Sequence, residues 1–180
     1  MKKLLVVVDM QKDFVDGALG TKEAVAIVPN VCQKINGWDG DIIATLDTHE
    51  DNYMETREGK YLPVPHCING TEGHNLDKYV MAALVNAEDN GCKTKILMKP
   101  TFGSTALPEI IRGEKYDYIE FCGLCTDICV VSNCLMIKAH YPDTNIAVDA
   151  NCCAGVTPET HNAALTTMKM CQVNILNFEG

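Results

Sequence analysis

The sequence predicts an α/β protein of three layers, in which a doubly wound sheet of six parallel strands lies between two layers of helices. Three observations predict this fold. Short aliphatic runs without polar alternation recur along the chain, as in strands buried on both faces. Helical patterns separate these runs, which is the order that a parallel sheet requires. Most of the runs end in a polar or charged residue, at the edge where such sheets bind ligands.

The strands are expected at 3–8, 41–46, 94–98, 116–124, 145–148 and 173–178. Helices are expected at 22–37, 75–88, 106–112, 127–140 and 158–171. In the first of these, the helix proper should start near Pro29, because proline favours the first turn. Thr157 is the expected N-cap of the last helix. Residues 50–71 form an irregular segment rich in Tyr, Pro and Gly, and a loop of that length indicates a function.

Length and composition indicate one soluble domain, residues 1–180. The chain carries a net charge of −9, which argues against nucleic acid or an anionic membrane surface as a partner. Its longest apolar runs are too short to span a bilayer. Asp9 interrupts the first run too early for a signal peptide. We therefore expect a cytoplasmic protein whose ten cysteines are reduced thiols.

Three expected strand ends supply a carboxylate, an ammonium and a thiol, from Asp9, Lys99 and Cys129. Cys129 lies where a helix should follow a strand, and a helix N-terminus favours the nucleophilic thiolate. Asp9 can take the thiol proton and return it to a leaving group. Lys99 should keep Asp9 ionised and stabilise the thiolate. The set suits acyl transfer from an amide; the alternative is that Cys129 is a small buried hydrophobic residue and that the charges simply meet solvent.

Three motifs make the resemblance to a known family specific. The segment Asp9-Met10-Gln11-Lys12-Asp13-Phe14 resembles the D-x-Q-x-D-F opening of the isochorismatase-like cysteine hydrolases. Residues 99–104 look like the lysine loop of that family. Residues 123–130, Gly-Leu-Cys-Thr-Asp-Ile-Cys-Val, look like its nucleophile turn. Together with the strand order, the resemblance extends from about Lys3 to Phe178.

The resemblance implies a catalytic triad with Cys129 as nucleophile, Asp9 as general acid and base, and Lys99 as its electrostatic partner. It also implies a cis peptide bond before Cys125, so that the N–H groups of Cys125 and Cys129 form an oxyanion hole. Phe14 and Leu124 are the expected substrate-binding residues. Because the amidases of this superfamily keep the nucleophile, the presence of Cys129 favours amide hydrolysis.

Nicotinamidases of the superfamily add a metal site, and Asp47-x-His49 and Pro65-His66 match its pattern. The resemblance implies Glu58 as the fourth ligand, with Glu55 as the alternative. Two imidazoles and carboxylates suit zinc, iron or manganese, and no organic cofactor is expected. Asp47 and His49 could instead be a hydrogen-bonded strand end. Family members with a Trp three residues before the loop histidine use it in the ring pocket, and this chain has Pro63 at that position.

The sequence thus predicts a nicotinamidase-type amidase that works through a thioester on Cys129, and the resemblance implies a homo-oligomer. One alternative is another amidase of the superfamily, acting on a carbamoyl or ureido compound, a branch that generally lacks the metal pattern. The other is a non-catalytic binding protein with the same fold, and the intact Asp9, Lys99 and Cys129 argue against it.

Overall fold

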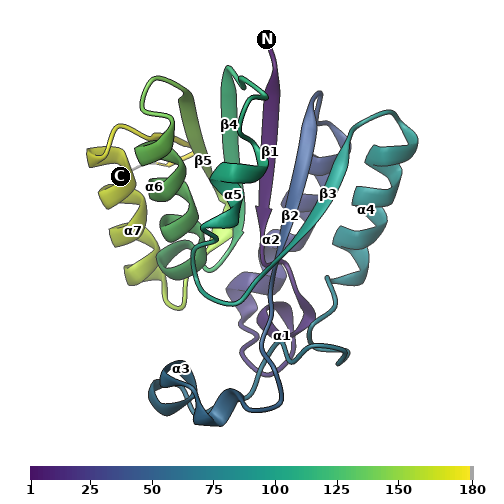
Figure 1. Cartoon of the computed structure of the whole chain (residues 1–180), viewed down its shortest axis with the longest axis vertical. Coiled ribbons are helices and arrows are strands. Elements are labelled where there is room, and N and C mark those ends of the chain that lie inside the picture. The colour runs from purple at the N-terminus through teal and green to yellow at the C-terminus, as the bar shows by residue number, and fades with distance from the viewer. Residues whose placement is uncertain (179–180) are drawn as a thin grey trace.

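Six parallel strands form the centre of the molecule, in the order β3-β2-β1-β4-β5-β6. The computed structural model describes residues 1–178 and confirms the predicted sheet (Figure 1). The strands are β1 (Lys3–Val8), β2 (Asp41–Asp47), β3 (Thr94–Lys99), β4 (Tyr118–Leu124), β5 (Asn145–Ala154) and β6 (Asn174–Leu176).

β1 lies at the middle of the sheet, and its aliphatic run is buried on both faces. Leu4 to Val8 have no exposed surface. Complete burial of a Val or Leu side chain contributes about 1.5–3 kcal/mol, so this strand is the centre of the core. Val8 pairs with Thr45 of β2 on one side and with Gly123 of β4 on the other.

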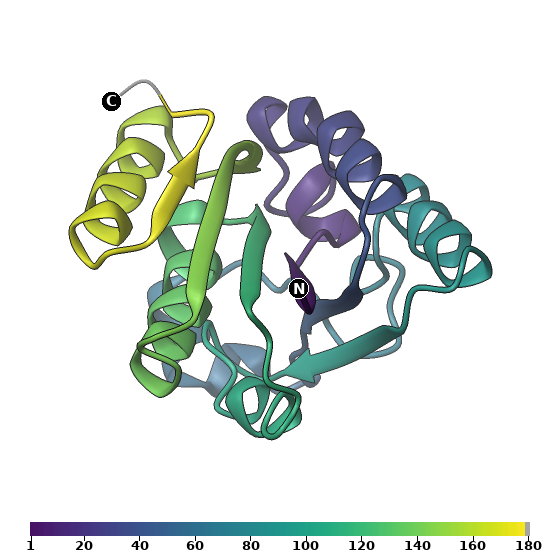
Figure 2. The same ribbon diagram turned by 90° about the horizontal axis from the view of Figure 1, so that it is seen from above.

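Helices cover both faces of the sheet, as Figure 2 shows. One face carries α1 (Lys12–Val15), α2 (Lys22–Asn36) and α4 (Lys78–Asp89), and the other carries α5 (Ala106–Ile110), α6 (Val131–His140) and α7 (Pro158–Met170). Within residues 1–178, every helix falls short of the length and apolar character that a membrane span requires.

The strand order reverses between β1 and β4, because the chain builds outward to β3 and then returns to the other side of β1. Ligands of open parallel sheets bind at the carboxyl edge of such a reversal. The chain segment with the turn η1 (Tyr53–Glu55) and the helix α3 (Arg57–Tyr61) lies beyond this edge (Figure 1). Both lie in the stretch expected to be irregular, and each is too short for a periodic signal.

The prediction that the helix within residues 22–37 starts near Pro29 is wrong. α2 begins at Lys22, where the Thr21 hydroxyl accepts a hydrogen bond from the Ala24 N–H, and Pro29 lies inside the helix. Proline has no N–H for the carbonyl of Val25, which normally costs about 3 kcal/mol. Both Pro29 and Val25 lie on the exposed face, so water can satisfy that carbonyl while the opposite face stays buried against α4 and β5.

β5 extends six residues beyond the predicted end at Val148. Polar Asp149 and Asn151 resemble a strand end, but a register shift opposite Phe121 and Gly123 of β4 allows pairing to resume. Other bounds move less: β4 starts at 118 instead of 116, α4 at 78 instead of 75, and β6 covers only 174–176. The predicted helix 127–140 is divided into a π-helical turn, η2 (Thr126–Val130), and α6.

Candidate active site

The chain leaves β1 at Asp9, whose backbone is in the left-handed region with φ 48°. The side chain is fully buried. Its Oδ1 accepts a hydrogen bond from Thr45 Oγ1 at 2.6 Å, and its Oδ2 lies 2.6 Å from Lys99 Nζ. Apart from this ion pair, Oδ2 accepts no well-aligned hydrogen bond from the residues that the structure describes. This oxygen can therefore receive a proton.

Lys99 ends β3, two strands away from β1, and only a long side chain can reach Asp9 across the end of β2. Its ammonium group has no exposure to solvent. Besides Asp9, it contacts Asp47 Oδ1 at 3.2 Å, the carbonyl of Thr101 at 3.1 Å and Cys129 Sγ at 3.5 Å. The prediction that Asp9, Lys99 and Cys129 come together at the carboxyl edge is thus matched by the geometry.

The turn that carries Cys129 begins with two unusual backbone features. Gly123 has φ 116°, and a Cβ at this position would lie 2.1 Å from the carbonyl oxygen of Val8. Only glycine therefore allows β4 to approach the end of β1. The Leu124–Cys125 peptide bond is cis, as predicted.

The π-helical turn η2 changes which N–H groups are hydrogen bonded. The carbonyl of Cys125 accepts from the N–H groups of Ile128 and Val130, both at 3.1 Å, whereas an α-helix would use the N–H of Cys129. The Cys125 N–H has no acceptor within residues 1–178. Asn133 Nδ2 donates to the Cys129 carbonyl at 2.7 Å and anchors the turn to α6. π-Helical turns of this kind are frequent at functional sites.

Burial has the largest effect on the acidity of the Cys129 thiol. It raises the pKa of the Cys129 thiol well above its usual value, and the charge of Asp9 raises it further, while Lys99 acts in the opposite direction. Burial likewise raises the pKa of Asp9 more than Lys99 lowers it. The expected stabilisation of the thiolate by Lys99 is therefore outweighed by burial. Cys129 lies within the turn, only 4% exposed, and needs a base.

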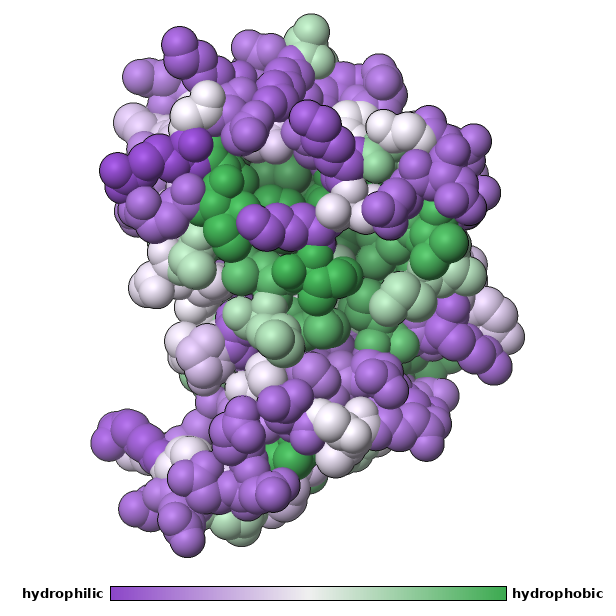
Figure 3. Space-filling model, turned by 45° about the vertical axis from the view of Figure 1, so that its right-hand side comes forward, coloured by the Kyte–Doolittle hydropathy of each residue, from purple (hydrophilic) through white to green (hydrophobic). Residues whose placement is uncertain are grey.

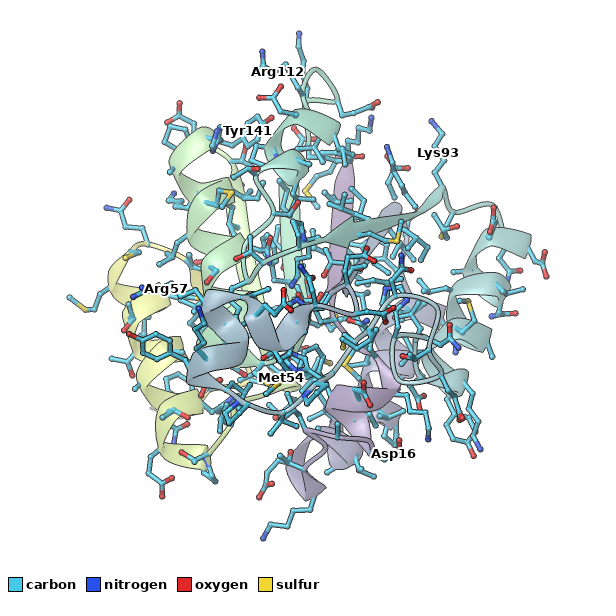
Figure 4. The ribbon with its side chains drawn as sticks, turned by 60° about the horizontal axis from the view of Figure 1, so that its bottom comes forward. Asp16, Met54, Arg57, Lys93, Arg112 and Tyr141 are labelled. Carbon is cyan, nitrogen blue, oxygen red and sulfur yellow. The ribbon has the colours of Figure 1, made fainter. Side chains whose placement is uncertain are left out.

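Four further side chains form a compact group beside this triad. Asp47 and His49 come from the end of β2, Glu58 from α3, and His66 from the loop after α3. One ligand atom from each lies within 4.8 Å of all the others. Glu55, the alternative fourth ligand, is outside this group. Figure 4 looks onto this edge of the sheet, with the segment of Met54 and Arg57 in front of it.

The donor set and its spacing fit a divalent transition metal. His49 Nε2 lies 2.9 Å from Asp47 Oδ2 and 3.5 Å from Glu58 Oε1, and His66 Nε2 lies 3.6 and 3.7 Å from the same two oxygens. Ligands at zinc bond lengths in a tetrahedron would be about 3.4 Å apart. His66 Nδ1 bonds the Val64 carbonyl at 2.8 Å, which directs Nε2 to the group.

Asp47 supplies negative charge to this group. Burial raises the pKa of Asp47, but hydrogen bonds from His49 and His66 outweigh burial and hold it well below the usual range. Asp47 is therefore a carboxylate. The pKa of Glu58 is raised, chiefly by burial, and a bound cation would favour its ionised form.

One cavity of about 240 Å³ is lined both by Cys129 and by members of the metal-ligand group. Its lining includes Cys125 and Cys129 together with Asp47, Glu58 and His66 of the metal-ligand group. Phe14, which was predicted to bind substrate, lines this cavity. Its ring packs against the His66 ring, with the ring centroids 5.4 Å apart. The remaining walls are mostly apolar and come from Leu19, Thr21, Leu62, Phe102, Ile128 and Val156.

Leu124 is not a wall of this cavity, contrary to the prediction. Its side chain is 1% exposed and belongs to the core under the sheet edge. Sequence reasoning missed Leu62, Phe102 and Val156, which lie in loops. The sequence offers one signal for them, because each is a large apolar residue in a loop. In the structure their side chains remain 38%, 42% and 53% exposed, in that order.

Comparisons with known proteins agree with this geometry. The isochorismatase domain model matches residues 3–179. The isochorismatase family protein PncA of Bacillus subtilis (strain 168) is 27% identical over 174 residues, covering 92% of this chain and 93% of the relative. The crystal structure of nicotinamidase/pyrazinamidase PncA from Bacillus subtilis is 25% identical with a TM-score of 0.84, covering 98% of this chain and all of the other.

A second solved structure holds a metal. Pyrazinamidase of Pyrococcus horikoshii, in complex with zinc, is 27% identical with a TM-score of 0.77, over 99% of this chain and 100% of the other. The family model extends over nearly the whole length, from the first strand to the last. This chain therefore belongs to the isochorismatase family.

Proposed function

We propose that this protein is a metal-assisted nicotinamidase that converts nicotinamide to nicotinate and ammonia through a thioester on Cys129. The observation that carries the proposal is that Cys129, the thiol of the buried Cys-Asp-Lys set, lines the same cavity as three of the four candidate metal ligands, Asp47, Glu58 and His66. The similarity to nicotinamidase/pyrazinamidase PncA supports the choice of substrate.

In the first step, Asp9 removes the proton from the Cys129 thiol as sulfur attacks the amide carbon. A general base must have a pKa near the working pH, and burial moves the pKa of Asp9 upward in that direction. Lys99, held against both Asp9 and the sulfur, offsets the negative charge that moves between them.

The N–H groups of Cys125 and Cys129 are our candidates for the oxyanion hole. The π-helical turn leaves the Cys129 N–H without its α-helical acceptor, Cys125 O, and the Cys125 N–H has no acceptor among the residues that the structure describes. Ammonia then leaves with the proton held by Asp9. Water, activated by the same carboxylate, hydrolyses the thioester.

Asp47, His49, Glu58 and His66 are the proposed metal ligands. When bound there, zinc, iron or manganese would orient the pyridine ring through its nitrogen and add positive charge to the cavity. The apolar walls, Phe14 among them, would contact the faces of the ring and exclude water.

We also propose that residues 1–180 act as one domain in the cytoplasm. The described part has one sheet and one hydrophobic core. All ten cysteines are free thiols, a state that a reducing compartment maintains.

Self-association through the outer strand β3 is a further part of the proposal. β3 is the edge of the sheet, and Ile96 and Met98 are 44% and 59% exposed. Figure 3 shows a hollowed apolar area on the side of the molecule where β3 and α4 lie. A two-fold axis at Leu97 would pair Ile96 of one copy with Met98 of the other, so the strand is self-complementary, as an isologous interface requires.

Ammonia release from nicotinamide tests the catalytic proposal. We expect a turnover that Cys129→Ala lowers by roughly a thousand-fold or more, while the control Cys171→Ala, an exposed cysteine outside the cavity, leaves it unchanged. Equal rates in the parent and Cys129→Ala would refute the mechanism. Faster ammonia release from a carbamoyl compound than from nicotinamide or pyrazinamide would identify the other amidase branch.

A further inference from the structure

Two polar side chains of the segment after β1, Gln11 and Asp13, hold the backbone of both chain segments that carry the histidine ligands. We propose that they are positioning residues that set the distance between the metal site and the catalytic triad. This inference rests on the proposed metal-assisted amidase and assigns to these residues a role that none of the metal-ligand or triad residues has.

Gln11 holds the end of β2. Its side chain has no exposure to solvent, and its amide forms two hydrogen bonds with the backbone of one residue, Asp47. The Oε1 accepts from the Asp47 N–H at 2.7 Å, and the Nε2 donates to the Asp47 carbonyl at 2.8 Å. A second acceptor for Nε2 is the His74 carbonyl, also at 2.8 Å. The backbone of Asp47 is thus fixed on both sides of its Cα atom.

Asp13 holds the loop of the second histidine. Its Oδ2 accepts from the Cys67 N–H at 2.8 Å, and its Oδ1 accepts from the Ala18 N–H at 3.2 Å. Cys67 follows His66 directly and has a left-handed backbone with φ 47°. That conformation is unfavourable for a residue other than glycine, so a fixed acceptor at its N–H helps to keep His66 in place.

The structure makes room for the Asp13 carboxylate. A Cβ on Gly73 would lie 2.1 Å from Asp13 Oδ2, and a Cβ on Gly17 would lie 2.6 Å from Asp13 Oδ1. Glycines therefore flank both oxygens of one carboxylate. Such close packing leaves the group little freedom to move, as positioning requires.

The two held segments also bond to each other. The His49 N–H donates to the Cys67 carbonyl at 3.0 Å, and the His49 carbonyl accepts from the Asn69 N–H at 2.7 Å. Gln11 and Asp13 therefore act on one connected unit that includes Asp47, His49 and His66. Asp9, the proposed general acid and base, lies two residues before Gln11. One short segment therefore carries Asp9 and also holds the metal ligands in place.

A positioning role predicts that a variant binds metal more weakly but keeps its turnover once metal is saturating. Loss of a group that orients metal ligands typically weakens metal affinity about 10–100-fold. Since the ligands and triad themselves remain, saturating metal should restore turnover. A purely structural role predicts lower stability of the metal-free protein, with turnover that added metal does not restore.

The experiment measures zinc affinity by competition with a chromophoric chelator, kcat on nicotinamide against free zinc, and urea unfolding of the metal-free protein. We expect Gln11→Met, which keeps the chain length and removes all three hydrogen bonds, to raise the Kd for zinc about 10–100-fold. At saturating zinc, its kcat should return to within about threefold of the parent. Lys12→Ala is the matched control, because Lys12 lies between the two residues and points to Asp16 at the surface.

Asp13 provides a second test that does not depend on the folding of the Gln11 variant. Asp13→Asn keeps one acceptor oxygen for the Cys67 N–H, and Asp13→Ala keeps none, so zinc affinity should fall less in the Asn variant. Parental zinc affinity in both Gln11→Met and Asp13→Ala overturns the inference. A parent protein that binds no zinc and releases no ammonia overturns the proposed function instead.

Discussion

Lys99 Nζ lies 3.2 Å from Asp47 Oδ1, while the other oxygen of the same carboxylate faces His49 at 2.9 Å. Asp47 therefore offers one oxygen to the triad and one to the metal-ligand group. Its charge balances the buried ammonium on one side and would balance a bound cation on the other. Binding and chemistry thus meet at a single carboxylate, although different residues perform them.

Replacing Lys99 should lower catalysis without removing the bound metal. We expect Lys99→Met to lower kcat for nicotinamide about 10²–10³-fold, because the buried charge that stabilises the reacting groups is lost. Stoichiometric metal should remain, since the four ligands stay in place. Lys95→Met, an exposed lysine of the same strand, is the control. Metal content is measured by elemental analysis; loss of metal from Lys99→Met would show that Lys99 belongs to the metal site.

Replacing the two histidines should remove the bound metal as well as the activity. His49→Ala combined with His66→Ala removes both nitrogen ligands, so bound metal should fall well below one per chain. Ammonia release should fall with it, and added zinc should not restore it. The control is His140→Ala, which alters an exposed histidine at the end of α6. Parental metal content in the double variant would remove the site from these residues.

Gly123 should be among the least replaceable residues of the turn. Its positive φ alone would cost a substituted residue about 1–3 kcal/mol, and a Cβ would also meet the Val8 carbonyl at 2.1 Å. Gly91 also has a positive φ, 94°, but open space around it. We therefore expect Gly123→Ala to lower the free energy of unfolding in urea by at least about 2 kcal/mol more than Gly91→Ala does. Equal losses would mean that β1 and β4 can separate.

The ends of the buried strands could be predicted from the sequence for a simple physical reason. A run of aliphatic residues that stops at Asp9 or Asp47 must leave the core there, because an unpaired charge is costly to bury. Parallel pairing then brings the carboxyl ends together. The positions of Asp9, Asp47, Lys99 and Cys129 follow from this and from the three motifs.

What the sequence did not predict depends on neighbours that are distant along the chain. Pro29 remains inside α2 because the Val25 carbonyl, which lacks an N–H partner there, lies on the exposed face. Sequence periodicity cannot reveal this. The cavity walls Leu19, Leu62 and Val156 come from three separate loops. Burial among groups from several elements raises the pKa of the Cys129 thiol, whereas local spacing indicated only the helix that follows.

The β3 edge leads to a prediction about assembly. If two copies pair through this strand, Ile96→Lys and Met98→Lys should each convert a dimer into a monomer, because a buried unpaired lysine opposes association. Sedimentation equilibrium at micromolar concentration measures the mass. Met170→Lys, at a methionine that is 80% exposed at the end of α7, should leave the dimer intact. A parent that sediments as a monomer would contradict pairing through β3.

The pH dependence of stability should reveal a second buried charge group, away from the active site. Lys34 of α2 lies 2.8 Å from Asp149 Oδ2 and also pairs with Glu120. Burial raises the pKa of Asp149, but hydrogen bonds from Lys34 and Asn177 outweigh burial and hold it below the usual value. For Lys34, burial lowers the pKa, and the bonds to Asp149 and Glu120 outweigh it and raise the pKa.

The sign of the effect follows from these two directions. A carboxyl group with a lowered pKa in the folded state stabilises the protein above its unfolded pKa, about 3.9, and this contribution is lost as the pH falls through the folded value. The raised pKa of Lys34 extends the window upward to its unfolded pKa of about 10.4 and beyond. Asp149→Asn should therefore lower the free energy of unfolding by about 1–2 kcal/mol at pH 7, and the gap to the parent should close as the pH falls below about 4. Urea unfolding between pH 3 and 9 measures this gap, with the exposed Asp143→Asn as control; a gap that stays constant down to pH 3 would mean that the Asp149 charge does not contribute.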